Sequence, residues 1–302
     1  MESKNLNSSE QKAKQVFTKD DLVRDLVNLG VQKGDALSLR VSVGSIGWIE
    51  GGADTLVEAL LEAVGEKGTI VSAAYVHPFP LPLSKENAEK IVKDDRIPSY
   101  AGALANAMIK HPDMYRSKHP VNRYVAIGAR AYELTKSHTP DKYAYDVLRI
   151  LAETRGKNLI IGKKVGGTGT DHISHYMLGL KQFRKPEGIN YIDEDGQIKL
   201  LIVNWQRGCI RGHSKFWPLF EQGGAIIGQE KIGNAGAKLT DMKKTLEIEM
   251  NKLRENPSFL LCDIPTCRDC RLSWEFSNGN IWIVNFNRLF GKIKKLFRAK
   301  II

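Results

Sequence analysis

Long apolar segments are missing from this chain, because no run approaches the ~18 apolar residues that a membrane-spanning helix needs. The first ten residues are polar and hold no apolar signal core, so we expect no secretory signal. Cysteine is scarce, at four in 302 residues, and without an export signal we expect reduced thiols in the cytoplasm. With 42% hydrophobic residues, the chain can still bury a full core in one large domain or two joined subdomains.

Acidic residues are absent from the last fifteen positions, which makes the net charge of +11 uneven along the chain. Six cations lie there: Arg288, Lys292, Lys294, Lys295, Arg298 and Lys300. About +5 remains for the body of the protein. This excess fits an anionic cofactor but gives no reason to expect nucleic acid, and it argues weakly against an acceptor that is itself a polycation.

Residues 31–75 predict a strand, a glycine-rich loop, a helix and a second strand. The first strand is expected from Ala36 to Val43, the helix from Ala53, and the second strand from Thr69 to Ala74. Turns from a strand into a helix are where α/β proteins bind ligands. The alternative is a tight connection without a ligand.

Further elements follow from the pattern of apolar residues and from capping signals. Thr18 and Asp21 indicate a capping box that opens a helix ending at Gly30. Helices are also expected near 84–94, 102–109, 146–153, 170–180 and 239–254, and strands near 124–127, 159–161, 189–205, 258–262 and 280–284. The alternation through residue 180 predicts an α/β fold, a mixed β-sheet flanked by helices on both faces, with a smaller C-terminal α+β portion.

Several motifs occur in an order typical of one enzyme family. They are Gly51-Gly52-Ala53-Asp54-Thr55, Arg116-Ser117-Lys118-His119-Pro120, Thr168-Gly169-Thr170-Asp171-His172, and Gly208-Cys209 with Ile232-Gly233-Asn234-Ala235. Over residues 18–270 the chain resembles the aminoglycoside 3-N-acetyltransferase family. The resemblance implies transfer of an acyl group from acetyl-CoA, or another acyl-CoA, directly to an amino group of an aminoglycoside or related amino sugar. The flanking segments are then a polar extension (1–17), a strand region (271–284) and a basic tail (285–302).

His172 is the candidate general base, since an imidazole with a pKa of roughly 6.5 accepts a proton near neutrality. The preceding turn places Thr168 and Thr170 where hydroxyl and N–H groups could polarise the acyl carbonyl. In the family, a glutamate three residues after the histidine orients it. His175 stands there in this chain, and a neutral imidazole can orient His172 but adds no charge stabilisation.

More departures from the family occur at the positions that hold the cofactor. The family's His-Ser-Ser is Arg40-Val41-Ser42, the serine after His-Pro is Arg123, and a Ser-Pro is Tyr145-Asp146. The candidate cofactor-binding residues are Arg40, Ser42, His119, Arg123 and Thr168. Arginines suit phosphate or carboxylate, which indicates a more anionic donor or acceptor. The alternative is a catalytically impaired binding or scaffold protein on the same fold.

The four cysteines are spaced as metal ligands often are. Cys262, Cys267 and Cys270 form a tight group, and Cys209 lies upstream, with His213 as a spare candidate. Four thiolates would make a closed tetrahedral zinc site of structural type. An iron–sulfur cluster and four unligated thiols are the alternatives.

The C-terminal segment 285–302 predicts an amphipathic helix. Its apolar residues recur at helical spacing: Phe286, Leu289, Phe290, Ile293, Leu296 and Phe297. A basic opposite face predicts peripheral contact with an anionic membrane at the inner surface. The alternative is a helix docked on its own domain or on the partner of a homodimer.

Overall fold

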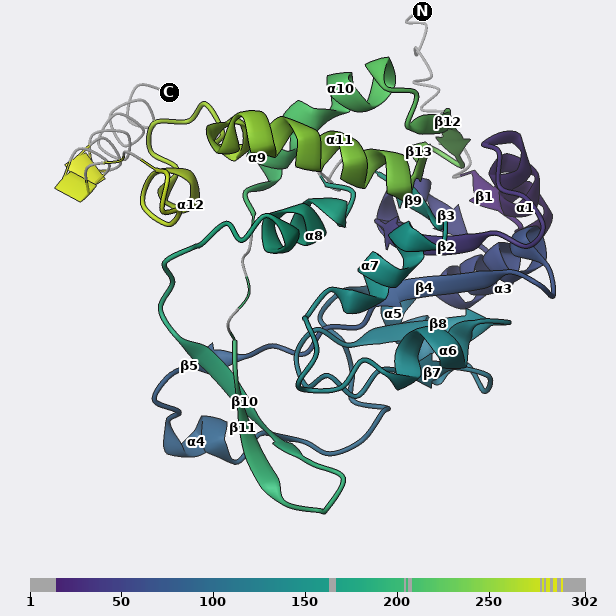
Figure 1. Ribbon diagram of the computed structural model, residues 1–302. Helices are drawn as coiled ribbons and strands as arrows, with labels where there is room; N and C mark the ends of the chain where they lie inside the picture. Colours follow the sequence, from purple (N-terminus) through teal and green to yellow (C-terminus); the bar gives the residue numbers. More distant parts are fainter. Residues whose placement is uncertain are drawn as a thin grey trace, which may run out of the picture.

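A seven-stranded sheet forms the centre of the molecule, with the strand order β12-β13-β9-β2-β4-β8-β7 (Figure 1). The structure is a computed structural model that describes residues 15–162, 167–203, 205, 208–277, 279, 281–282, 285–286 and 289. The strands are β2 (Ala36–Val41), β4 (Thr69–Ala73), β7 (Tyr115–Arg116), β8 (Tyr124–Gly128), β9 (Lys157–Ile161), β12 (Ile226–Ile232) and β13 (Ala235–Asp241). β2 runs parallel to both of its neighbours, and the other pairs are antiparallel. The sheet is therefore mixed, as predicted.

Helices cover both faces of this sheet, which confirms the predicted layers (Figure 1). Successive strand residues point to opposite faces, so Ile70 of β4 packs in one core cluster and Val71 in the other. The first face carries α1 (Lys19–Asn28), α3 (Gly52–Val64) and α5 (Ala103–Lys110). The second face carries α6 (Ala131–Lys136), α7 (Asp146–Glu153), α8 (Thr170–Met177) and α11 (Met242–Glu255).

Smaller elements surround this centre. A four-stranded sheet comprises β5 (Phe79–Pro80), β6 (Ile91–Val92), β10 (Glu187–Ile192) and β11 (Ile198–Ile202), next to the single turn α4 (Lys85–Ala88). β1 (Val16–Phe17) pairs with β3 (Trp48–Ile49), and α2 is Val43–Ile46. A third core cluster unites the 3-10 turn η1 (Ser214–Phe216), α10 (Trp217–Gln222), the 3-10 turn η2 (Pro257–Leu260) and α12 (Arg268–Arg271), and Cys209, just before α9 (Ile210–His213), packs against it.

Local signals with a strong chemical basis are confirmed. The Thr18 hydroxyl accepts the N–H of Asp21 and the Asp21 carboxylate accepts the N–H of Thr18, which is the predicted capping box. The helix expected over residues 146–153 has those bounds.

Three of the predicted elements are wrong, and one helix is present but starts later than predicted. The helix expected at 84–94 is the single turn α4 followed by β6, because residues 91–92 pair with β10. The helix expected from 239 begins at Met242, since residues 235–241 form β13 beside β9. The strand expected at 258–262 is the 3-10 turn Pro257–Leu260. Of the strand expected at 280–284, residues 281 and 282 are helical and the other three lie outside the described residues.

Most of the tail 285–302 lies outside the described residues. The side chains of Phe286 and Leu289 are described and are exposed, as is Trp282 just before the tail. Within the part of the chain that the structure describes, none of the helices has both the length and the apolar character that crossing a bilayer requires.

Candidate active site

The candidate site forms where two parallel strands end. β2 and β9 are neighbours with Arg40 opposite Ile160, so the segments that follow both strands meet at one edge of the sheet. Arg40 extends from there to the start of α8, where its Nη1 lies 3.2 Å from the position that a Cβ on Gly169 would occupy. The structure thus brings Arg40 together with His172 and the threonine turn.

Asp171 is the centre of the charges at this edge. One carboxylate oxygen, Oδ1, accepts the N–H of Gly169 at 2.8 Å. The other, Oδ2, lies 3.1 Å from Nε2 of His213 and 3.7 Å from Nε2 of His172. Burial alone would raise the pKa of Asp171, but His213, His172 and Arg40 together hold it well below its usual range. Asp171 is therefore a buried, ionised carboxylate beside the candidate base.

His172 is partly exposed, at 17% of its side chain, although its Nδ1 is buried. Its ring stacks on the ring of Tyr145 with centroids 4.2 Å apart, and its backbone carbonyl accepts the hydroxyl of Tyr143 at 2.6 Å. Tyr145, one of the departures from the family, thus covers one face of the imidazole ring. These contacts fix the ring while leaving one part of it open to solvent.

His175 does not supply what the family's glutamate supplies. Its ring is fully buried, stacks 5.5 Å from the ring of His213 and meets the edge of Trp274 at 5.0 Å. Burial, and then the nearby His213, lower the pKa of His175 well below its usual value, so it stays neutral. Burial also lowers the pKa of His213. The carboxylate nearest to His172 is instead that of the preceding residue, Asp171.

Asp171 is not among the candidate residues identified from the sequence, although the sequence carries a signal for it. It directly precedes the candidate base in the first turn of a helix, where a carboxylate is favoured by the helix dipole. For His213 the sequence suggests only a spare metal ligand. Its contact with Asp171 joins residues 42 positions apart, which no local pattern reveals.

Thr168 and Thr170 are buried in a hydroxyl network rather than directed at a ligand. Their hydroxyls lie 2.8 Å apart; Thr168 donates to Glu249 and Thr170 to Thr245 of α11. Burial raises the pKa of Glu249 well above its usual value, and Asp171 acts in the same direction. As placed, these hydroxyls hold the start of α8 against α11, and polarising a carbonyl would fall to backbone N–H groups.

The other expected cofactor positions lie apart from this network. Ser42 follows β2, and its hydroxyl accepts that of Ser45 at 2.8 Å. His119 is buried, accepts the N–H groups of Val121 and Asn122 through Nδ1, and stacks on His138 at 5.0 Å. Burial, with smaller contributions from His138 and Arg123, lowers the pKa of His119 to about 3. His119 is therefore a neutral structural imidazole.

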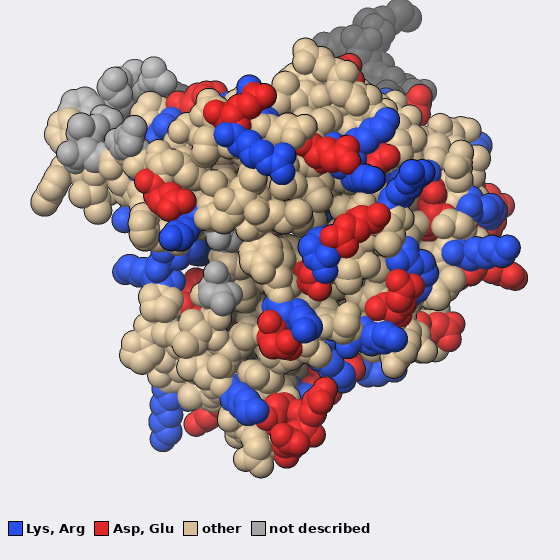
Figure 2. Space-filling model, viewed as in Figure 1, with Lys and Arg blue, Asp and Glu red and all other residues tan. Residues whose placement is uncertain are grey.

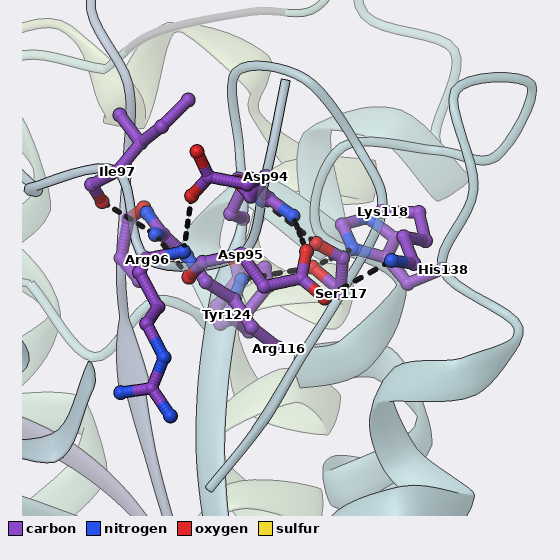
Figure 3. Close-up of polar contacts among 11 residues, drawn as sticks. Asp94, Asp95, Arg96, Ile97, Arg116, Ser117, Lys118, Tyr124 and His138 are labelled. Carbon is purple, nitrogen blue, oxygen red and sulfur yellow. Dashed lines mark hydrogen bonds and ion pairs between the residues drawn. The ribbon is translucent and has the colours of Figure 1, made fainter. Parts of the chain in front are cut away.

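Arg123 anchors a loop instead of facing a ligand. Its three guanidinium nitrogens bond to the carbonyl oxygens of Ser117 and Asp94 and to the carboxylate of Asp95. Arg116 secures the same loop through the carbonyl of Ile97, as Figure 3 shows. The phosphate-binding role expected for Arg123 has no support, because its donors are already engaged and its side chain is 3% exposed.

Arg123→Met is therefore expected to lower the free energy of unfolding by about 3 kcal/mol, because the buried carbonyls lose their donor and Asp95 loses a buried partner. Lys118 pairs with the same Asp95 at 3.0 Å but is 61% exposed. Lys118→Met, the matched control, should cost less than about 1 kcal/mol. Urea unfolding of both variants measures the difference, and equal effects would contradict the anchoring role.

A pocket of about 610 Å³ lies beside this loop, between residues 92–95, the turn 139–141 and the hairpin β10–β11. Its lining includes Asp94, Asp95, Asp141, Asp193, Glu194 and Asp195, together with Lys93, Lys118, Arg123 and Lys199. Figure 2 shows acidic side chains gathered over the tip of this hairpin. His172 is not part of the lining, so the pocket is separate from the charge centre around Asp171.

The four cysteines do come together. The sulfur atoms of Cys209, Cys262, Cys267 and Cys270 all lie within 4.8 Å of one another, and all four thiols are free. These residues are the metal-ligand candidates of the described chain, and His213 is not one of them, because it contacts Asp171.

Comparisons with known proteins identify the family. Residues 39–254 match the model of the aminoglycoside 3-N-acetyltransferase family. Aminoglycoside N(3)-acetyltransferase VII of Streptomyces paromomycinus is 31% identical over 136 residues, which are 41% of this chain and 47% of that protein. The chain spans about half the length of the curated relatives it matches.

Solved structures share the fold. AAC-IIIb in a binary complex with CoASH has a TM-score of 0.71 at 23% identity, over 80% of this chain and 97% of that one. Aminoglycoside acetyltransferase AAC(3)-IVa in complex with a gentamicin has a TM-score of 0.72 at 21% identity, over 86% and 97%. Because the family model covers more than two thirds of the sequence, the chain belongs to the aminoglycoside 3-N-acetyltransferase family.

Proposed function

We propose that the protein is an N-acyltransferase that moves an acyl group from an acyl-CoA, acetyl-CoA in the simplest case, to an amino group of an aminoglycoside or related amino sugar. The observation that carries the proposal is the pairing of the partly exposed His172 with the buried carboxylate of Asp171. Membership of the family and the solved neighbours, one with CoASH and one with a gentamicin, support the substrate classes.

The proposed step is direct transfer with His172 as the general base. The acceptor nitrogen attacks the thioester carbonyl while its proton passes to His172, so the C–N bond forms as the C–S bond breaks. The imidazolium that results lies 3.7 Å from the ionised Asp171, which stabilises it. The departing CoA thiolate then takes the proton, and His172 returns to its neutral form.

Thiol release from acetyl-CoA, measured with a panel of aminoglycosides and amino sugars, tests the proposal, and calorimetry with acetyl-CoA accompanies it. Release that depends on an amine supports the transferase. Binding of acetyl-CoA without thiol release from any amine would favour the scaffold alternative, which the engaged hydroxyls of Thr168 and Thr170 also suit.

Zinc, if bound by the four cysteines, is proposed as structural and has no part in this chemistry, because four thiolates leave no open ligand position. A homodimer and a cytoplasmic location stay predictions.

The tail carries a separate proposal of peripheral membrane contact. We expect the full-length protein to sediment with anionic liposomes at low salt, because each basic residue near such a surface contributes about 1 kcal/mol. Truncation after Val284 should leave it in the supernatant with unchanged affinity for acetyl-CoA. Liposomes of neutral lipid are the control. Equal recovery of both proteins in the anionic pellet would reject the membrane role and leave the docked helix.

A further inference from the structure

Three separate segments bring the four cysteines together. Cys209 caps α9, Cys262 follows the turn Pro257–Leu260, and Cys267 and Cys270 lie at the start of α12 and inside it. The sulfur atoms of Cys209 and Cys267 are 3.8 Å apart. Zinc bound to four thiolates at about 2.3 Å in a tetrahedron places the sulfurs about 3.8 Å apart, whereas a disulfide requires about 2.05 Å. The spacing therefore fits a tetrahedral thiolate site.

The surroundings suit the charge of such a site. Zinc with four thiolates carries a net charge of −2, which N–H donors and cations can offset. The N–H of Cys262 points to the sulfur of Cys270 at 3.3 Å, and the N–H groups of Arg211 and Gly212 point to that of Cys209. The guanidinium of Arg271 bonds to the carbonyl of Cys262 at 2.6 Å.

Two chain segments, here called arms, connect the cysteine cluster to the candidate active site. The first arm is α9, which begins after Cys209 and ends at His213. The N–H of His213 bonds to the carbonyl of Cys209, and the ring of His213 lies 3.1 Å from Asp171. Gly208 lets the chain pass over this ring, since a Cβ there would lie 1.5 Å from Nε2 of His213. A ligand bond to Cys209 would therefore hold the turn that positions His213.

The other arm leads through α12. Trp274, four residues after Cys270, packs its ring 5.0 Å from that of His175. Trp274 also forms a β-bridge with Gln182, and the carbonyl of Ser273 accepts the N–H of Phe183. The segment after α12 therefore lies beside the residues that come just after α8. The two arms thus contact α8 from two sides, at the carboxylate of Asp171 and at His175.

We propose that the four cysteines bind one zinc ion, which clasps α9 to α12 and thereby holds His213 and Trp274 against the histidines and the carboxylate of α8. The metal site itself depends only on the cysteine geometry. Its consequence for catalysis rests on the proposed function.

Metal content tests the site directly on the full-length protein. We expect about one zinc per chain after desalting, and Co²⁺ exchanged into the site should show the thiolate-to-cobalt charge-transfer and visible bands of tetrahedral coordination. Cys267→Ser should lose both signals, and Asp269→Ser, an exposed neighbour in α12, should keep both. A parent protein without metal that offers four titratable thiols, or that holds disulfides, would overturn the proposal regardless of how the variants fold.

Hydrogen exchange tests the clasp. Removing the metal from the parent with a chelator, or through Cys267→Ser, should raise exchange several-fold in α8, α9 and residues 272–275 while β2, β4 and β8 stay protected. Unchanged exchange in α8 on loss of the metal would reject the coupling. Zinc in a protein that transfers no acyl group to any amine would instead reject the proposed function and leave the clasp standing.

Discussion

His172→Ala is expected to reduce amine-dependent thiol release by about 10²–10⁴-fold, which is the usual contribution of a positioned general base. The affinity for acetyl-CoA measured by calorimetry should stay within about twofold, because the substitution removes a partly exposed ring and opens no core cavity. His111→Ala provides a matched control. His111 is also a mostly buried histidine beside a carboxylate, at 3.6 Å from Glu58, but it lies at the end of α5.

Transfer by His172→Ala at the parent rate would show that another group takes the amine proton. A loss of acetyl-CoA binding as large as the loss of turnover would instead place His172 in cofactor binding. The two quantities, measured on one preparation, separate these outcomes.

Asp171→Asn is expected to lower kcat at least about tenfold and to move the acid limb of the pH–rate profile to lower pH. The carbonyl oxygen of the introduced asparagine can still accept the N–H of Gly169, so the variant removes the charge and keeps the turn. Without the carboxylate, the protonated form of His172 is less stable. Asp35→Asn is the control and should leave the profile in place, because this partly buried carboxylate pairs with Lys157 just before β2, at the opposite end of that strand from the candidate site.

The free energy of unfolding should also depend on the charge of Asp171. The pKa of Asp171 is lowered in the folded protein, where His213 and His172 outweigh desolvation, relative to about 3.9 in an unfolded chain. Its contribution is therefore present above about pH 3.9 and is lost as the pH falls through the lower folded value. The gap in free energy of unfolding between parent and Asp171→Asn should be largest near neutrality and shrink toward pH 3. A gap that grows on acidification would contradict the assignment.

Short-range chemistry made part of this fold predictable. The capping box at Thr18, the strand and helix of residues 36–64 and the helix Asp146–Glu153 depend on side chains a few positions apart, and those are readable in the sequence. The order of motifs also predicted the family and placed His172 at the start of a helix. These signals are readable because they are set within one turn or one strand.

The environment of each candidate residue depended on tertiary structure instead. From the sequence, Arg123 is a candidate phosphate ligand, but in the structure its guanidinium bonds to Asp95 and two backbone carbonyls. The sequence also cannot show that the ring of His175 is fully buried and stacks on His213. The strands β12 and β13 become part of the central sheet through the pairing of β13 with β9, which lies more than 70 positions earlier in the chain.

The sequence by itself determined the family, the helix that bears the candidate base and the presence of four cysteines. Tertiary structure alone decided that Asp171 supplies the carboxylate, that His213 contacts it, and that Cys209 meets three cysteines more than 50 positions downstream. The physical reason is that burial, charge pairing and sulfur geometry depend on distances between atoms, and those distances exist only after the layers have packed.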